Sequence, residues 1–182
     1  MNAYPLGIYL VAAIAYIVHF AKRHDGAGRV ATVTLVLGLL DGVERPALGG
    51  PLLTPLSQTV LVDLGTNMDC RPTQLLGFAA IGCAFARSVQ GIGDPRVALL
   101  SVGAEAEKGN RQVQEAHPMF KESGLNFVGN VEGGDLFLDR ADVVVCDGFI
   151  GNVLMKFGEG MSLALTKQLR KLLDGRFPAE EL

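Results

Sequence analysis

The chain has 182 residues, of which 49% are hydrophobic and 19% are charged, a composition typical of one globular domain and not of a disordered chain. Its formal net charge of -3 provides no basic surface of the kind that nucleic-acid binding needs, so we expect no nucleic-acid partner. The three cysteines include no CxxC pair, which argues against a disulfide framework and a structural zinc site and favours a reducing cytoplasm.

The first 34 residues differ in character from the rest of the chain. Leu6 to Ala21 is almost wholly apolar, broken only by His19, and two basic residues follow it. The run is shorter than the roughly 20 residues that cross a bilayer, and it lacks the features of a signal peptide. A buried core helix, a membrane-associated helix and a sequence foreign to the fold all stay open for this segment. We therefore separate residues 1–34, an atypical N-terminal segment, from a domain over residues 35–182.

Strands and helices alternate from Val60 onward. Val60 to Leu64 is a short apolar, β-branched run that predicts a strand, and apolar residues recur at helical spacing from Thr73 to Gln90. Further strands are expected at 96–102, 125–128 and 142–146, and further helices at 110–121, with its last turn disturbed by Pro118, and at 153–173. Continuous apolar strands that alternate with helices indicate an α/β fold with a mainly parallel sheet covered on both faces.

Polar loops that contain glycine follow these strands. In an open α/β sheet, ligands bind outside the carboxyl ends of the strands. Glycines let backbone N–H groups approach a ligand, and a helix N-terminus carries a partial positive charge, so Lys108, Asn110 and Asn152 outline a candidate phosphate pocket. For any single loop, the alternative is that Asp, Asn and Gly only cap helices and make turns. The loops are Asp63-x-Gly65-x-Asn67-x-Asp69, Gly103-x-Glu105-x-x-Lys108-Gly109-Asn110, Gly129-Asn130-Val131-Glu132-Gly133 and Asp147-Gly148-Phe149-x-Gly151-Asn152.

Several other kinds of site lack their signatures. The sequence has no GxGxxG after the first strand and no GxxxxGK[ST], so neither a dinucleotide nor a Walker-type nucleotide site is expected. The loop from Asp63 to Asp69 lacks a glycine and a downstream glutamate at the spacing of a calcium loop. His117 stands alone in the sequence, so we expect no metal and no cofactor. Cys146 is interpreted as a small buried residue, because no histidine lies near it in sequence to activate it.

Taken together, the loops resemble one family. The strings VLVDLGTNMDCRPTQLLGFA, PRVALLSVGAEAEKGN, NFVGNVEGGDLF and ADVVVCDGFIGNVLMKFGEG, preceded by GVERPAL, are similar to the central part of the acyl-acyl-carrier-protein:phosphate acyltransferases of the PlsX type. The match runs in register from about Leu35 to Gly160. The resemblance implies a three-layer, mainly parallel α/β fold like that of isopropylmalate dehydrogenase.

The resemblance also implies a reaction. Members of the family transfer a long-chain acyl group from acyl-carrier protein to inorganic phosphate, which gives acyl-phosphate for phospholipid synthesis. It implies a cytoplasmic homodimer, peripheral to the inner face of the cell membrane, whose product passes to a membrane glycerol-phosphate acyltransferase. Two alternatives stay open: a phosphotransacetylase-like enzyme that uses acyl-coenzyme A, and a non-catalytic remnant that acts as a dimerising or membrane-tethered module.

Residue roles follow from the motifs that match. Lys108 of the EKGN word and Asn152 of the GFIGN word match the residues thought to carry catalysis in this family. Phosphate is itself the nucleophile, so Lys108 could hold it while the Asn152 amide donates to the thioester oxygen. Asn130, Glu132 and Asp147 are expected to orient these two groups. The remaining expected substrate-binding residues on the same edge are Asn110, Gly151, Asp63 and Asn67.

Parts of the family pattern are missing. An AVDAMGGD-like start and a SAGNTGA-like loop precede GVERPAL in the family, whereas Met1 to Thr34 holds the apolar stretch. The family also continues beyond the long helix, so we expect an incomplete chain with its membrane-hook region present at most in part. Lys167, Arg170 and Lys171 on that helix are interpreted as a solvated face.

Overall fold

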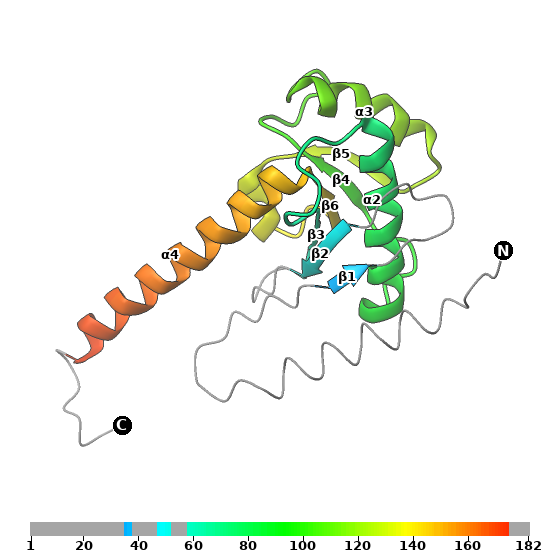
Figure 1. Ribbon diagram of the computed structural model, residues 1–182. Helices are drawn as coiled ribbons and strands as arrows, with labels where there is room; N and C mark the ends of the chain where they lie inside the picture. The colour runs from blue at the N-terminus through cyan, green and yellow to red at the C-terminus, as the bar shows by residue number, and fades with distance from the viewer. Residues whose placement is uncertain (1–34, 38–46, 52–57, 175–182) are drawn as a thin grey trace.

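The computed structural model describes residues 35–37, 47–51 and 58–174 (Figure 1). The apolar run from Leu6 to Ala21 lies outside these residues. The described strands are β1 (Leu35–Leu37), β2 (Ala47–Pro51), β3 (Val60–Val62), β4 (Val97–Leu100), β5 (Phe127–Val131) and β6 (Val143–Val145). The helices are α2 (Pro72–Phe85), α3 (Arg111–Glu122) and α4 (Gly148–Asp174), with a π-helical turn η1 (Ala86–Gln90) and a 3-10 turn η2 (Gly133–Phe137).

The described strands form one sheet in the order β1-β2-β3-β6-β4-β5. The strands β3, β6, β4 and β5 are parallel, with Leu61 paired to Val144 and Leu99 paired to Val145. The strands β1 and β2 add an antiparallel edge beside β3. The expected α/β fold with a mainly parallel sheet is confirmed, and the carboxyl ends of the parallel strands lie at one edge.

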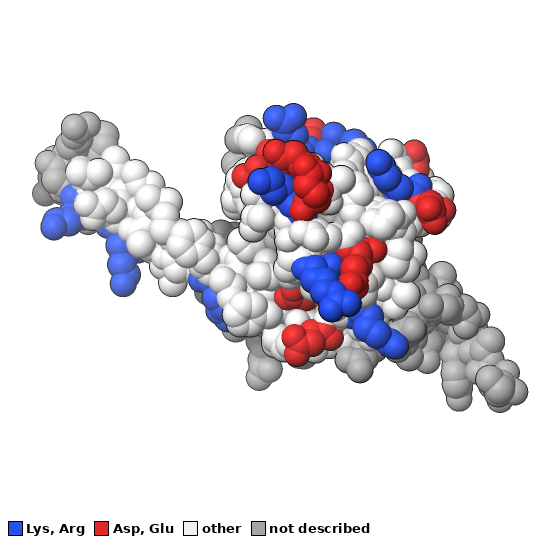
Figure 2. All heavy atoms as spheres, turned by 90° about the horizontal axis from the view of Figure 1, so that it is seen from above, with Lys and Arg blue, Asp and Glu red and all other residues white. Residues whose placement is uncertain are grey.

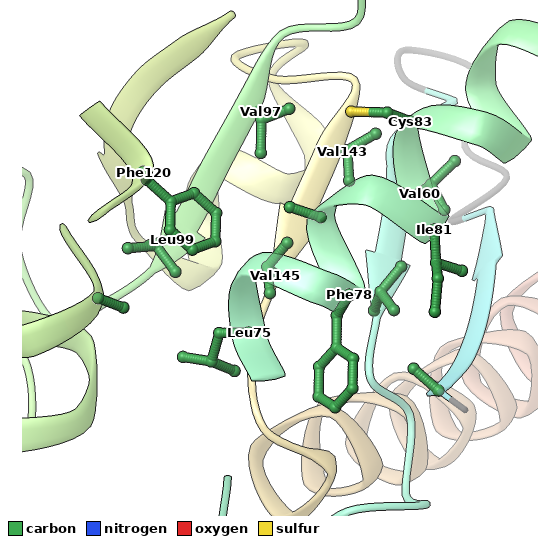
Figure 3. Packing of buried hydrophobic residues seen from close by; sticks show 14 of the residues in the cluster. Val60, Leu75, Phe78, Ile81, Cys83, Val97, Leu99, Phe120, Val143 and Val145 are labelled. Atoms are coloured by element: carbon green, nitrogen blue, oxygen red, sulfur yellow. The ribbon is translucent and has the colours of Figure 1, made fainter. Parts of the chain in front are cut away.

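Apolar side chains cover both faces of the parallel strands, because successive strand residues point to opposite sides. Val60 and Val62 pack with α2 and α3 on one face, where Phe78 and Phe120 are fully buried (Figure 3). Leu61 lies in the cluster on the other face, which η2 and the first turns of α4 cover. The sheet is therefore the middle of three layers, as a sheet of continuous apolar strands requires.

Helix α2 begins at Pro72, where the missing N–H of proline costs no hydrogen bond. The helical run expected from Thr73 to Gln90 is divided into α2 and the turn η1, and it ends at Gly91, which has a left-handed φ of 74°. Helix α3 passes through Pro118 and continues to Glu122, so this proline does not end the helix.

Helix α4 starts at Gly148, five residues before the sequence-based boundary at Val153. The side chain of Asp147 explains the early start, because its Oδ1 accepts a hydrogen bond of 2.8 Å from the N–H of Ile150. The far half of α4 extends away from the sheet (Figure 1). Basic side chains lie along one side of this projecting part (Figure 2), where Lys167 is exposed as expected. Within the described ranges, no helix is long and apolar enough to cross a membrane.

Candidate active site

The turn after β3 is organised by a buried carboxylate. Asp63 is 0% exposed, and its Oδ1 accepts hydrogen bonds of 3.1 Å from the N–H groups of Gly65 and Thr66. Its Oδ2 accepts bonds of 2.8 Å from both the backbone N–H and the side-chain amide of Asn67. The carboxylate therefore fixes the course of the turn, and the side chain of Asn67 is bonded inside it.

The start of α4 packs directly on this turn. The N–H of Gly148 donates to the carbonyl of Asn67 at 2.7 Å. A methyl group at Gly151 would overlap the carbonyl oxygen of Asp63, so only glycine permits this approach between helix and strand end. Two loops that are distant in sequence therefore meet here, one with Asp63 and Asn67 and the other with Asp147 and Gly151.

Asn152 is the fifth residue of α4 and is half-buried. A methyl group at Gly65 would lie 3.5 Å from the Cβ of Asn152 and 3.6 Å from its Oδ1. The amide side chain is thus beside the turn that Asp63 organises. Its position depends on the packing of α4 against that turn.

The loop between β4 and α3 carries Lys108. This residue is exposed, and its N–H donates to the carbonyl of Glu105 at 3.1 Å. Asn110 caps α3, because its Oδ1 accepts from the N–H of Val113 at 2.9 Å. Gly109, between them, has a φ of 104°, a left-handed conformation that favours glycine. Lys108 therefore lies one short turn before the N-terminus of a helix, where the backbone is electropositive.

The same loop is held from both sides by amide side chains. The Nδ2 of Asn130, on β5, donates to the carbonyl of Glu105 at 2.8 Å, and its Oδ1 lies 3.1 Å from Nδ1 of His117. The Nε2 of Gln114, on α3, donates to the carbonyls of Glu107 and Gly109 at 2.8 and 2.9 Å. Both polar groups of the Asn130 amide are therefore engaged in contacts within the protein.

Glu132 and Ser101 complete this side of the site. Glu132 is exposed at the end of β5, and its N–H donates to Oδ2 of Asp135 at 3.0 Å as η2 begins. The hydroxyl of Ser101, at the end of β4, is buried next to Gly109 and has no hydrogen-bond partner among the described residues. The loop motifs drew attention to glycines and charged residues, so Ser101, Gln114 and His117 were missed.

The two halves of the site follow neighbouring strands, since β6 lies between β3 and β4. A side-chain hydrogen bond of 2.6 Å joins them, from Nε2 of Gln112 on α3 to the carbonyl of Cys70. One half presents a lysine just before a helix N-terminus, and the other presents an asparagine at the fifth residue of a second helix. This arrangement suits an anion near Lys108 and an oxygen acceptor near Asn152.

The other reactive side chains offer little chemistry. Cys146 is buried, and this burial raises the pKa of its thiol well above the ordinary value, with the nearby Asp147 and Asp63 adding to the effect. It is therefore a protonated, inert thiol, as a small buried residue should be. Over the described part of the chain, no group of His, Cys, Asp and Glu is arranged to hold a metal ion.

Fold and site together define an α/β protein with a candidate anion site at the carboxyl edge of a parallel sheet. Comparison with known families gives a more specific placement. The model of a family described as fatty acid synthesis protein matches residues 23–180. The chain belongs to this family, which confirms the resemblance drawn from the loop motifs.

Curated relatives carry the name phosphate acyltransferase. The protein of Desulforudis audaxviator is 50% identical over 148 residues, which are 81% of this chain and 44% of the relative. That of Nitratidesulfovibrio vulgaris is 48% identical over 157 residues, 85% of this chain and 45% of the relative. That of Aquifex aeolicus is 44% identical over 142 residues, 78% of this chain and 42% of the relative. The family is thus one of acyltransferases, and the chain spans less than half the length of these relatives.

Proposed function

We propose that this chain carries the core of an active site that transfers a long-chain acyl group from acyl-carrier protein to inorganic phosphate. The main support is the position of Lys108 and Asn152 on segments that follow the adjacent parallel strands β4 and β6. Lys108 lies just before the N-terminus of α3, and Asn152 is the fifth residue of α4. The names of the relatives supply phosphate as the acceptor. The acyl-phosphate product and the carrier protein are part of the proposal.

In this proposal Lys108 binds the phosphate acceptor. Its exposed ammonium group can reach solvent, and the N-terminus of α3, capped by Asn110, adds a partial positive charge one turn away. A lysine is a compact charge on a mobile stem, which suits a small tetrahedral anion. Lys108 thus offsets part of the charge on phosphate and holds it near the thioester.

Asn152 polarises the thioester in the same proposal. Its side-chain amide can donate a hydrogen bond to the carbonyl oxygen as negative charge develops there. The turn around Gly65 and the close approach of Gly151 to Asp63 keep the first turn of α4 in place. Because this frame exists before substrate binds, the amide needs little reorganisation during the reaction.

The reaction balances without a protein nucleophile. A phosphate oxygen attacks the carbonyl carbon, the carbon–sulfur bond breaks as the carbon–oxygen bond forms, and the electron pair leaves on sulfur. The carrier-protein thiolate takes a proton from the medium, and acyl-phosphate departs. The buried Cys146 takes no part in these steps.

The remaining residues orient these two groups. Asp63 and Asn67 shape the turn beside Asn152, and Asp147 caps α4. On the other half, Asn130 anchors the loop of Lys108. Glu132 is exposed just after β5, and we assign it to the edge of the site that faces the substrate.

The wider setting is also a proposal. We place the protein in the cytoplasm, as a homodimer peripheral to the membrane, where a glycerol-phosphate acyltransferase receives its product. The projecting part of α4 supports this setting, because large apolar side chains are exposed along it. They include Phe157, Met161, Leu163, Leu165, Leu169 and Leu172.

The test is to incubate the purified chain with acylated carrier protein and inorganic phosphate and to measure acyl-phosphate. We expect release of acyl-phosphate, and a loss of at least about a hundredfold in Lys108→Ala and in Asn152→Ala, as expected for groups that stabilise transition-state charge. Lys121→Ala and Asn126→Ala are matched controls, because both residues lie at the opposite edge of the sheet. Lys121 is in the last turn of α3, and the Asn126 amide donates to the carbonyl of Asp94.

Two other results would replace the proposal. Acyl-phosphate formed from acyl-coenzyme A, but not from acylated carrier protein, would identify a phosphotransacetylase-like enzyme. A chain that is folded by circular dichroism and releases no acyl-phosphate from either donor would be a non-catalytic module. Full activity in Lys108→Ala would refute the assignment of the phosphate site.

A further inference from the structure

We propose that His117 is a positioning residue for Lys108, and that it acts through Asn130 on the loop between β4 and α3. This inference rests on the proposed function for its meaning, because Lys108 matters as the group that holds phosphate. The loop anchoring itself can be tested separately. Neither the loop motifs nor the family comparison assigns a role to His117.

A chain of hydrogen bonds connects the histidine to the loop. The Asn130 amide contacts the carbonyl of Glu105 at 2.8 Å, and a carbonyl oxygen can only accept, so Nδ2 of Asn130 must face it. The amide oxygen therefore faces His117, 3.1 Å from Nδ1. That oxygen can only accept as well, so Nδ1 of His117 must carry the hydrogen. The contact thus fixes the tautomer of the imidazole.

His117 and Asn130 are both buried, which limits the access of water to their contact. His117 is 7% exposed and Asn130 is 6% exposed. The imidazole also packs edge-on against Phe127, with ring centroids 5.0 Å apart and the planes at 75°. A buried amide that loses its partner carries a desolvation penalty, so removing the Nδ1 donor should loosen Asn130 and the carbonyl of Glu105 that it holds.

Lys108 lies between this anchor and a second one. Its N–H bonds the carbonyl of Glu105, the same carbonyl that Asn130 holds. On its other side, the carbonyls of Glu107 and Gly109 are held by Gln114. His117 and Gln114 both belong to α3. This helix therefore holds the loop in place on both sides of Lys108, through Asn130 on one side and directly through Gln114 on the other. The loop is then ordered before phosphate arrives, which reduces the entropy lost on binding.

The alternative is a core histidine whose ring only fills space beside Phe127. Three variants separate the two readings. His117→Phe keeps a planar ring but removes the donor, whereas His117→Asn removes the ring and offers an amide N–H near the position of Nδ1. Ile81→Val removes one buried methyl group from α2, in the core and away from the loop, and serves as a control for general loss of stability.

Two measurements are made on each purified chain. Amide hydrogen exchange follows the N–H of Lys108, and titration with inorganic phosphate follows the chemical shifts of the loop amides. In His117→Phe we expect exchange at Lys108 to rise about fivefold, the effect of losing one hydrogen bond, and the Kd for phosphate to rise by a similar factor. In His117→Asn both values should return toward those of the unaltered chain, and Ile81→Val should change neither.

Several results would overturn the proposal. The first is amide exchange at Lys108 that is no faster in His117→Phe than in Ile81→Val. The second is exchange that is as fast in His117→Asn as in His117→Phe. The third is faster exchange in His117→Phe with an unchanged Kd for phosphate. If His117→Phe does not fold, the nitrogen shifts of the unaltered imidazole decide, since a tautomer without hydrogen on Nδ1 contradicts the chain of bonds. Failure of the unaltered chain to bind phosphate would remove the proposed function, while the exchange comparison would still decide whether His117 anchors the loop.

Discussion

Replacement of Asp63 by asparagine tests whether this carboxylate has a structural role, namely to hold the turn after β3 through its hydrogen bonds. Asparagine keeps the shape of the side chain but leaves one acceptor oxygen. That oxygen fits best at the position of Oδ2, which receives the two short bonds of 2.8 Å from Asn67. The new amide NH₂ then faces the N–H groups of Gly65 and Thr66, which lose their bonds of 3.1 Å to Oδ1.

The size of the effect follows from these contacts. Each hydrogen bond to a charged group is worth about 1.5–3 kcal/mol, so two lost bonds give about 3–6 kcal/mol. Thr66 is exposed, so water can restore part of the loss, and a neutral amide is less costly to bury than a carboxylate. We therefore expect Asp63→Asn to lower the free energy of unfolding by about 2–3 kcal/mol.

Urea unfolding, followed by circular dichroism, measures this change. Asp69→Asn is the matched control, because Asp69 belongs to the same loop and is exposed. The control should change stability by less than about 0.5 kcal/mol, as surface substitutions usually do. A loss in Asp63→Asn no larger than that of the control would refute the structural role and return Asp63 to direct contact with substrate.

Other predictions concern close packing and pH. Gly151→Ala should lower the free energy of unfolding by about 1–3 kcal/mol, because the methyl group would overlap the backbone at the end of β3. In Gly158→Ala nothing lies within 4 Å of the added methyl. Urea unfolding of this variant should therefore show a free energy of unfolding higher by about 0.5–1 kcal/mol. Equal effects at both glycines would contradict the close approach of α4. Burial alone would raise the pKa of Asp142, but the hydrogen bonds and charge of Arg96 outweigh it and hold that pKa below its ordinary value. A depressed pKa stabilises the fold above the pKa of the unfolded chain, about 3.9, and this stability is lost as pH falls through the folded value. The urea midpoint should therefore fall less between pH 5 and pH 3 in Asp142→Asn than in the unaltered chain, and equal falls would argue against the Arg96 contact.

The strands β3, β4 and β6 were predictable because all of their residues are buried. The run Val60-Leu61-Val62 faces apolar clusters on both sides, so its sequence is apolar without alternation. The N-terminus of α3 was also predictable, since Asn110 caps that helix with its own side chain. Such signals are local in sequence, so they can be recognised without knowledge of contacts with distant segments.

The missed features depend on contacts between distant segments. Strand β2 contains Gly49, Gly50 and Pro51, which have low strand propensity, and it forms by pairing with β3. The first turn of α4 contains Gly148 and Gly151, which suggest a loop until their close packing on the turn after β3 is known. The link between His117 and Asn130 joins a helix to a strand, so no spacing in the sequence indicates it.

The order of the strands has a consequence for synthesis of the protein. Strand β6 follows β4 and β5 in sequence but lies between β3 and β4 in the sheet. Just beyond the paired strands, the thiol of Cys146 contacts the carbonyl of Asp63, 83 residues away in sequence. Until β6 has left the ribosome, the facing edges of β3 and β4 have no partner, and their apolar side chains stay open to water or to other chains. Nascent chains that end before residue 145 should therefore depend on chaperones, and the two halves of the site should assemble in one late step.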